Sequence, residues 1–424
     1  MKTISVRIVF FLSVIISVLF PSGYILLPMD DTQGNHLKAY GITHTALKAG
    51  IESAWLLNYR GGSFLLRRNP RLEELCSVRG VSYQAVDENQ RINILNEMKS
   101  MNMAEIKLEK SPRIAVYTPL NKNPWADAVT EVLEYAEIAY DKIYDEEVLG
   151  GKLAEYDWLH LHHEDFTGQY SKFWWSYRTQ PWFRSEVATL EQAARKAGFT
   201  RVADHKLAVA KTIQLAVHGG LFMFAMCTAT ETIDIALAAE GMDIIPQEID
   251  GTAILQDTIE KINDRKLPYY KTFAFENFSV NTRIFENSFS DIDYNQVNTP
   301  RRKEVTDFIL FDFAAKYDPI PALLCQNHCN RIHGFFGQTT GFNPEVIKDG
   351  VIILAKSIDD SARYIHGNYG KGTFTFYGGH SPEDKNHYVG DKPPNMDIHR
   401  NSPGYRLILN NILFPSAKPP EKKT

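Results

Sequence analysis

The chain has 424 residues, with 46 Lys and Arg against 51 Asp and Glu, which gives a formal net charge of −5. This balance, without a basic stripe, predicts no nucleic-acid partner. The length suffices for about two domains with separate cores. No Walker A or Gly-rich dinucleotide motif is present, so we expect no nucleotide cofactor.

The first residues are typical of a signal peptide. Lys2 and Arg7 precede an apolar run over residues 8–20, and Pro21-Ser22-Gly23 supplies a break with small residues. The run is shorter than the roughly 20 residues that a membrane span needs. Residues 1–23 therefore predict export to the periplasm or the exterior, with no membrane span after cleavage.

Residues 24–108 predict a small N-terminal α/β domain. Its apolar runs indicate strands at 24–28, 51–57 and 81–86, and its helical periodicity indicates helices at 36–48, 72–76 and 90–99. The charged stretch 107–112 marks the expected domain boundary.

Residues 113–415 predict a second α/β domain. Strands at 113–119, 140–144 and 156–163 alternate with helices at 125–136 and 204–218, which favours a doubly wound parallel sheet of the flavodoxin-like kind. Residues from about 245 to 320 lack a clear period but are rich in aromatics, so we expect an ordered insertion or lid. The polar residues 416–424 predict a disordered tail.

Cys227 lies where an apolar run over 221–226 passes directly into a helix that begins at Thr228. Small residues two positions before and after it suit a sharp strand-to-helix turn. Thr228 and Glu231 have the spacing of a capping box. A thiol near the positive end of a helix dipole is favoured as thiolate, so the pattern indicates a nucleophile, the alternative being a buried core cysteine.

A second element, far downstream, has a strand over residues 372–377 followed by His380, Pro382 and Glu383. Together with the Cys227 elbow, it resembles the class I glutamine amidotransferase-like superfamily. The resemblance implies a Cys-His-Glu triad that cleaves an amide through a thioester, with Cys227 as nucleophile, His380 as base and Glu383 as the orienting carboxylate. The family usually places the carboxylate two residues after the histidine, so Asp384 is an alternative to Glu383.

The chain as a whole is similar to exported bacterial proteins labelled asparagine synthetase B. The similarity rests on residues 28–36, 58–62, 162–166 and 377–384. We do not expect ATP-dependent synthetase chemistry, because Lys2 follows the initiator methionine where a catalytic Cys would stand and no pyrophosphate-binding loop is found.

Polar and aromatic residues after the strand at 156–163 are candidates for substrate binding. The polar set is His162, His163, Glu164 and Asp165, which should lie at the carboxyl edge of the sheet. Trp174 and Trp175 belong to an aromatic cluster that could stack on a sugar or peptide, or close a domain interface. Residues His160 to Asp165 also suggest an alternative function, a metal-assisted hydrolase. The leading hypothesis includes no metal.

The remaining cysteines allow other arrangements. Four residues of metal-ligand type lie close together in the sequence, but their spacing matches no zinc pattern: Cys325, His328, Cys329 and His333. The disulfide state of the two cysteines is open.

The leading expectation is a hydrolase of amides or peptides that acts on a small-molecule or peptide substrate. The alternative from another class is a non-catalytic cell-envelope binding protein on the same fold. The sequence leaves the oligomeric state open.

Overall fold

Two β-sheets organise the described part of the chain, which comprises residues 23–119, 127–294, 307–326, 329–333, 339–383 and 392–418 of a computed structural model. The first sheet has six strands, and every pair of neighbours in it is antiparallel. Its order is β15 (Ala417–Lys418), β5 (Ala104–Leu108), β2 (Ser53–Leu57), β3 (Ser63–Arg67), β1 (Tyr24–Leu27) and β4 (Gln84–Val86).

The second sheet is mixed and has nine strands. Its order is β11 (Arg331–Ile332), β10 (Phe308–Leu310), β12 (Ile352–Lys356), β13 (Ala362–Tyr369), β14 (Gly372–Tyr377), β9 (Phe222–Met226), β8 (Trp158–His162), β6 (Ile114–Tyr117) and β7 (Asp141–Ile143). The strands from β14 to β7 are parallel to one another, and those from β11 to β13 are antiparallel to their neighbours. β6, β8 and β14 are buried along their whole length, as expected for strands covered on both faces.

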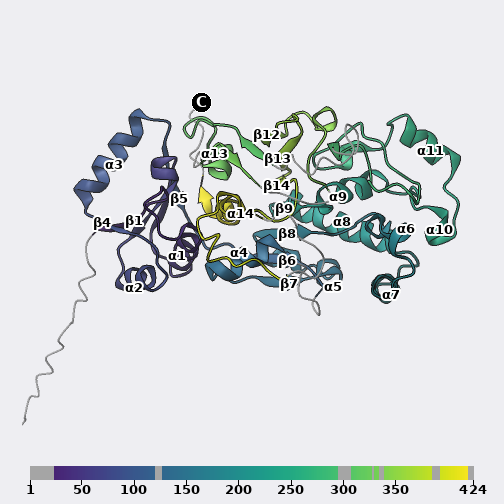
Figure 1. Ribbon diagram of the computed structural model, residues 1–424, viewed down its shortest axis with the longest axis horizontal. Helices are drawn as coiled ribbons and strands as arrows, with labels where there is room; N and C mark the ends of the chain where they lie inside the picture. Colours follow the sequence, from purple (N-terminus) through teal and green to yellow (C-terminus); the bar gives the residue numbers. More distant parts are fainter. Residues whose placement is uncertain are drawn as a thin grey trace, which may run out of the picture.

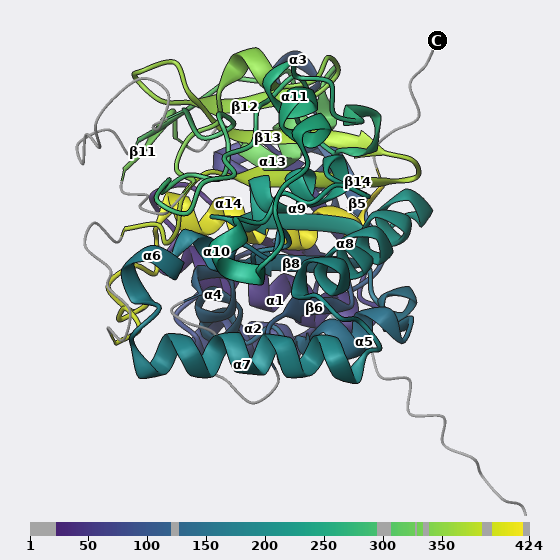
Figure 2. The same ribbon diagram turned by 90° about the vertical axis from the view of Figure 1, so that its right-hand side faces the viewer.

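Helices cover both faces of the nine-stranded sheet. One face packs against α4 (Ala128–Ala136), α13 (Pro319–Cys325) and α14 (Pro403–Leu413). The other packs against α5 (Asp145–Leu149), α8 (Val202–Gly219) and α9 (Ala229–Ala238). Further out lie α6 (Trp174–Tyr177), α7 (Pro181–Lys196), α10 (Gln247–Asp250) and α11 (Gln256–Asn263). Figure 2 shows α7 running along one edge of the molecule.

The two sheets share one hydrophobic core. Trp55 and Phe64 of the six-stranded sheet belong to the same buried cluster as Trp158 and Tyr377 of the nine-stranded sheet. Figure 1 shows α14 between the two sheets, with α1 (His36–Lys48), α2 (Pro70–Val78) and α3 (Glu88–Ser100) on the N-terminal side. The predicted division into two domains therefore stays a prediction, although the chain does cross from one sheet to the other between β5 and β6.

Two expectations need correction. The disordered tail predicted for residues 416–424 is wrong at its start, because Ala417–Lys418 form β15 and pair with β5, and residues 419–424 lie outside the described residues. Much of the segment expected as an insertion or lid is core: Phe273, Phe275 and Phe278 are buried on the α9 side of the sheet. Aromatic side chains can bury without a regular period when a loop is held by polar anchors. Here Asp234 accepts hydrogen bonds from three successive backbone N–H groups at 273–275.

Across the described ranges, no helix has the length and apolarity that crossing a bilayer requires. Residues 1–22, on which the signal-peptide prediction rests, lie outside these ranges.

Candidate functional site

Cys227 lies in a strained turn between β9 and α9. Its φ of 53° is in the left-handed region, which non-glycine residues seldom adopt. The side chain is 2% exposed, and the backbone N–H donates to the carbonyl of Gly379 at 3.2 Å. A residue forced into this conformation between a strand and a helix is typical of a nucleophile elbow.

The strands beside β9 bring histidines to the same edge of the sheet. β9 lies between β8 and β14, and Met226 at its end is in register with His162 on one side and Tyr377 on the other. All three strands are parallel, so their carboxyl ends meet at one edge. His162 and His163 therefore come from the end of β8, and His380 from the loop after β14.

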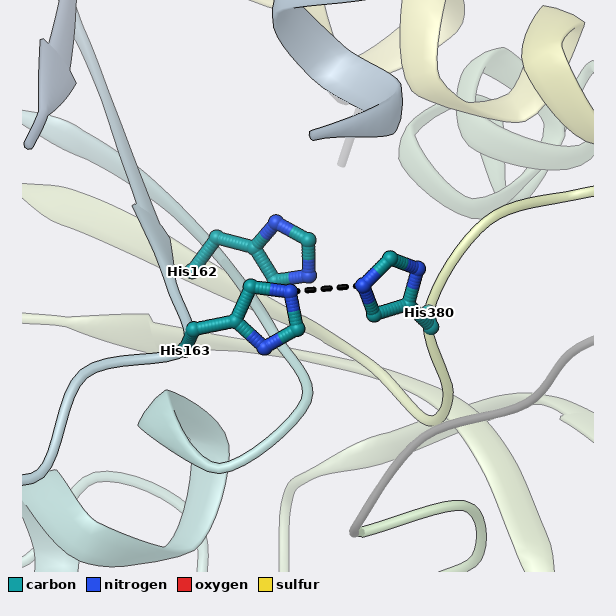
Figure 3. A group of neighbouring side chains, drawn as sticks. All are labelled: His162, His163 and His380. Carbon is teal, nitrogen blue, oxygen red and sulfur yellow. Dashed lines mark hydrogen bonds between the residues drawn. The ribbon is translucent and has the colours of Figure 1, made fainter. Parts of the chain in front are cut away.

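The rings of His162, His163 and His380 face one another across this edge (Figure 3). The Nε2 atoms of His163 and His380 are 2.6 Å apart, and the ring of His162 stacks on that of His163 with centroids 3.6 Å apart. One ring nitrogen from each of the three residues lies within 4.8 Å of the others. The predicted site residues from two distant parts of the sequence thus form one cluster.

A buried carboxylate anchors this cluster from behind. Asp127, at the N-terminus of α4, has one oxygen 3.1 Å from His160 Nε2 and 3.2 Å from His162 Nδ1. Burial acts to raise the pKa of Asp127, but attraction to His160 and His162 outweighs it and holds the pKa well below 3.8. The carboxylate is therefore ionised throughout the ordinary pH range and fixes the orientation of both rings.

His163 is held as a neutral imidazole. Burial lowers its pKa well below 6.5, and the neighbouring rings of His162 and His380 lower it further. Its φ of 54° is also left-handed, so its backbone leaves the extended path of β8 just where the ring turns toward His380. A neutral ring keeps one nitrogen lone pair for a proton or a metal ion.

Three carboxylates that were predicted to line the site lie differently. Glu383 is exposed, whereas the ring nitrogens of His380 lie against His163 Nε2 and, at 2.8 Å, Ser381 Oγ. Glu164 accepts from Lys206 Nζ at 2.6 Å inside a buried ion network. Asp165 accepts from the backbone N–H groups of Thr167 and Ser171, both at 2.7 Å, and so stabilises the turn after β8. The role of Glu383 stays a prediction, and Asp384 lies outside the described residues.

The predicted aromatic cluster lies on and around α6. Trp174 stacks with Tyr170, ring centroids 6.3 Å apart, and meets Phe183 edge to face. Trp175 is 54% exposed and carries the guanidinium of Arg178 over its ring. Trp174 is thus engaged in packing, whereas Trp175 offers an open face.

The expected capping box at the start of α9 does not form. Thr228 makes no capping hydrogen bond, and the buried carboxylate of Glu231 instead accepts from Ser290 Oγ at 3.0 Å and Thr339 Oγ1 at 2.9 Å. Burial, together with the nearby Asp293 carboxylate, raises the pKa of Glu231 to about 8. Glu231 is therefore protonated at neutral pH, and no negative charge from it opposes a thiolate at Cys227.

Replacing Glu231 with glutamine should change how stability depends on pH. The folded-state pKa exceeds the unfolded value of 4.5, so the carboxyl stabilises the fold below that value and this contribution is lost as pH rises through about 8. Between about pH 5 and about pH 9, the free energy of unfolding should fall less in Glu231→Gln than in the wild type, as measured by denaturant unfolding. The slopes of unfolding free energy against pH should differ by at most about 1.4 kcal/mol per pH unit. An equal loss in both proteins would contradict this assignment, and the exposed Glu97→Gln serves as the control.

The cysteine cluster near residue 325 is not arranged as a disulfide. Cys325 and Cys329 both carry thiols, and burial raises the pKa of Cys329 to about 11. His333 is 63% exposed and its Nδ1 lies 3.0 Å from Asp307 Oδ1. His328 lies outside the described residues, so the metal alternative for this segment stays open.

Residues 28–36 and 58–62, on which the expected resemblance to asparagine synthetase B-labelled proteins rests, meet in the structure. Arg60 forms a two-pronged ion pair with Asp30, with distances of 2.6 and 3.2 Å, and donates to Thr32 Oγ1. Arg406 of α14 donates to the carbonyls of Met29 and Gly61. These contacts join the loops of the six-stranded sheet to α14, which is a structural role.

Sequence reasoning missed Asp127, which holds the histidine cluster. In the sequence, an Asp directly before an apolar helix indicates an N-cap. The side chain of Asp127 does cap α4, because it accepts a hydrogen bond from the N–H of Val129 at 2.9 Å. The same oxygen also faces His160 and His162. Nothing in the local sequence indicates this second role.

Comparison with known proteins gives distant likenesses only. No family model matches the chain, and no curated protein matches it. Two solved structures from Salmonella typhimurium align with it: the cytoplasmic protein STM3548, at 9% identity over 71% of this chain and 97% of that one with a TM-score of 0.35, and the cytoplasmic protein STM1381 of strain LT2, at 10% identity over 66% and 91% with a TM-score of 0.34. Likenesses at this level carry no argument about activity.

Both of these proteins are described as cytoplasmic, which differs from the exported location predicted from residues 1–23. Nothing in the described residues supports export, and we do not propose it. What the molecule itself shows is an α/β fold whose parallel strands gather Cys227, His162, His163 and His380 at one edge.

Proposed function

We propose that this chain hydrolyses an amide or peptide bond, with Cys227 as the nucleophile and His380 as the general base. The observation that carries the proposal is the left-handed elbow at Cys227, set between two parallel strands whose ends bear histidines. This arrangement agrees with the resemblance to the class I glutamine amidotransferase-like superfamily. The α9 N-terminus behind Cys227 favours the thiolate.

The strand order supports the finer fold assignment within this proposal. Numbered by their order in the chain, the parallel strands β7, β6, β8, β9 and β14 have the spatial order 2-1-3-4-5, which is that of flavodoxin-like sheets. In such sheets ligands bind at the carboxyl ends of the strands. Cys227 and the three histidines lie at that edge.

The proposed reaction has two steps. His380 accepts the thiol proton, Sγ of Cys227 bonds to the carbonyl carbon, and the proton passes to the nitrogen as the amine or ammonia departs. Water then attacks the thioester, which releases the carboxylic acid and restores the thiol. Ser381, whose Oγ is 2.8 Å from His380 Nδ1, orients the base in place of a carboxylate and leaves Nε2 to accept the proton.

The substrate in this proposal is a small molecule or peptide that reaches the sheet edge past α6. Trp175 of α6 has an exposed ring, and His162 and His163 lie at the sheet edge. Trp175→Ala should raise KM for an amide substrate without a comparable change in kcat, because the ring contacts substrate in both ground state and transition state. A fall in kcat with KM unchanged would contradict this role.

The test is the rate of alkylation of Cys227 by iodoacetamide in the folded, metal-free protein, read by peptide mass mapping. We expect Cys227 to react faster than Cys329, whose raised pKa makes it an internal reference, and His380→Gln to slow Cys227 by about tenfold or more. The exposed His333→Gln is the matched control. Ammonia or amine release from a panel of amides should then depend on Cys227, with loss in Cys227→Ser.

A Cys227 that stays inert while Cys329 reacts would overturn the hydrolase proposal. The chain would then be a binding protein that uses the same edge without covalent chemistry.

A further inference from the structure

We infer that His162, His163 and His380 form a binding site for a divalent transition-metal ion of the zinc class. The inference goes beyond the proposed thiol chemistry and depends on different atoms. The sequence offered a metal only as an alternative, at His160 to Asp165, and without His380. His163 and His380 are 217 residues apart in the chain, so no ligand spacing could reveal the set.

The first argument is the geometry of the ring nitrogens. One nitrogen from each histidine lies within 4.8 Å of the other two. A metal ion bound at about 2.0–2.1 Å from three imidazoles in tetrahedral geometry sets their nitrogens roughly 3.3 Å apart. The His163 and His380 Nε2 atoms, now 2.6 Å apart, need to separate by less than about 1 Å to reach that spacing.

The second argument is that the far sides of two rings are already fixed. His162 Nδ1 lies 3.2 Å from Asp127 Oδ1, and His380 Nδ1 lies 2.8 Å from Ser381 Oγ. If His380 donates from Nδ1 to Ser381, its Nε2 lone pair is left for a metal, and a carboxylate beside a histidine, as at His162, is the usual partner of a metal ligand. Asp127 thus acts as a positioning residue.

The third argument concerns the contact between His163 and His380. Two Nε2 atoms 2.6 Å apart need one proton between them, so at least one ring must present N–H there. A metal ion can take both Nε2 lone pairs once that proton has moved to Nδ1 of its own ring or has left to solvent. Three protein nitrogens also leave a coordination position for water or substrate, as in catalytic rather than structural zinc sites.

Metal binding and the proposed thiol reaction compete for one atom. A metal ion on His380 Nε2 occupies the lone pair that a general base needs. We therefore expect bound Zn²⁺ to slow the alkylation of Cys227 to the rate seen in metal-free His380→Gln.

The experiment is titration of the full-length, chelator-stripped protein with Zn²⁺ by calorimetry, and with Co²⁺ by visible absorption. We expect one site per chain, with d–d bands typical of a tetrahedral nitrogen-rich site. His163→Gln should weaken binding by about 100-fold or more, and Asp127→Asn by about 10- to 100-fold with a changed Co²⁺ spectrum. The matched control is His218→Gln, an exposed histidine at the end of α8, which should bind as the wild type does.

Several results would overturn the site. These are the absence of saturable one-to-one binding, equal affinity in wild type and His163→Gln, or an equal loss of affinity in His218→Gln. Because a variant could misfold, each is compared by circular dichroism, and His380→Gln gives a second independent removal of a ligand.

The two proposals fail separately. Zn²⁺ binding is also measured in Cys227→Ser, where it should persist, and alkylation is measured in metal-free protein. An inert Cys227 with intact Zn²⁺ binding removes only the thiol proposal. A reactive Cys227 without Zn²⁺ binding removes only the metal site.

Discussion

Replacing Lys206 with methionine is expected to lower the free energy of unfolding by about 3–5 kcal/mol. Its ammonium is 1% exposed and donates to Asp145 at 3.0 Å and Glu164 at 2.6 Å. The hydroxyls of Tyr117 and Tyr144, each 3.1 Å away, complete its surroundings. Burial acts to lower the pKa of Lys206, but the two carboxylates outweigh it and raise the pKa well above 10.5. Methionine would leave both carboxylates buried without their cation.

Urea denaturation with circular dichroism measures this effect. The matched control is Lys211→Met, which removes an exposed ion pair with Glu240 and should cost at most about 1 kcal/mol. Adding Glu164→Gln and Asp145→Asn to Lys206→Met should recover part of the loss, because the buried charges go with their partner. Equal losses for Lys206→Met and Lys211→Met would show that the network contributes little.

Gly41→Ala is expected to destabilise the fold by about 1–3 kcal/mol or more. Gly41 lies inside α1, where α1 crosses the C-terminal end of α4. A Cβ built on Gly41 would lie 1.8 Å from the carbonyl oxygen of Ala136 and 2.9 Å from its carbon. Backbone atoms of a buried helix end cannot rotate away, so the helices must separate.

The control is Gly219→Ala at the end of α8, where an added Cβ meets open space. Alanine restricts the unfolded chain and suits a helix better, so this variant should be neutral or slightly more stable. Thermal or urea unfolding of both variants gives the comparison. A Gly41→Ala protein as stable as the wild type would mean that α1 and α4 can shift apart without cost.

The sequence predicted the parallel half of the large sheet well. The strands expected at 113–119, 140–144, 156–163 and 372–377 are present as β6, β7, β8 and β14, with ends shifted by at most two residues. These strands are short apolar runs bounded by turn residues, and burial on both faces makes such runs almost continuous. The local pattern and the tertiary environment therefore agree.

The antiparallel parts were harder to predict. β5 (Ala104–Leu108) alternates exposed and buried residues, and its charged members looked like a domain boundary. β3 (Ser63–Arg67) follows a tight turn in which Arg60 adopts a positive φ without being glycine. The loop covers residues 58–62, with Asn58, Gly61 and Gly62 also at positive φ, so it is longer than the two-residue turn that gives the usual hairpin signal.

Only part of the candidate site could be predicted from the sequence. Cys227, His162, His163 and His380 were each marked by residue type and by their place at a strand end. The contact of His163 with His380 depends on β9 lying between β8 and β14, which is tertiary information. The predicted capping box does not form because Glu231 instead accepts hydrogen bonds from Ser290 and Thr339, which lie in distant loops.

The pairing of β15 with β5 has a consequence for biosynthesis. The six-stranded sheet contains residues near the start of the chain, yet its outer strand is Ala417–Lys418. During translation the N-terminal strands leave the ribosome first but must wait for almost the whole chain before their last neighbour arrives. β5 therefore emerges with an open edge, which is the kind of surface that invites pairing with other chains. Completion of this sheet is a late step, coupled to the docking of α14.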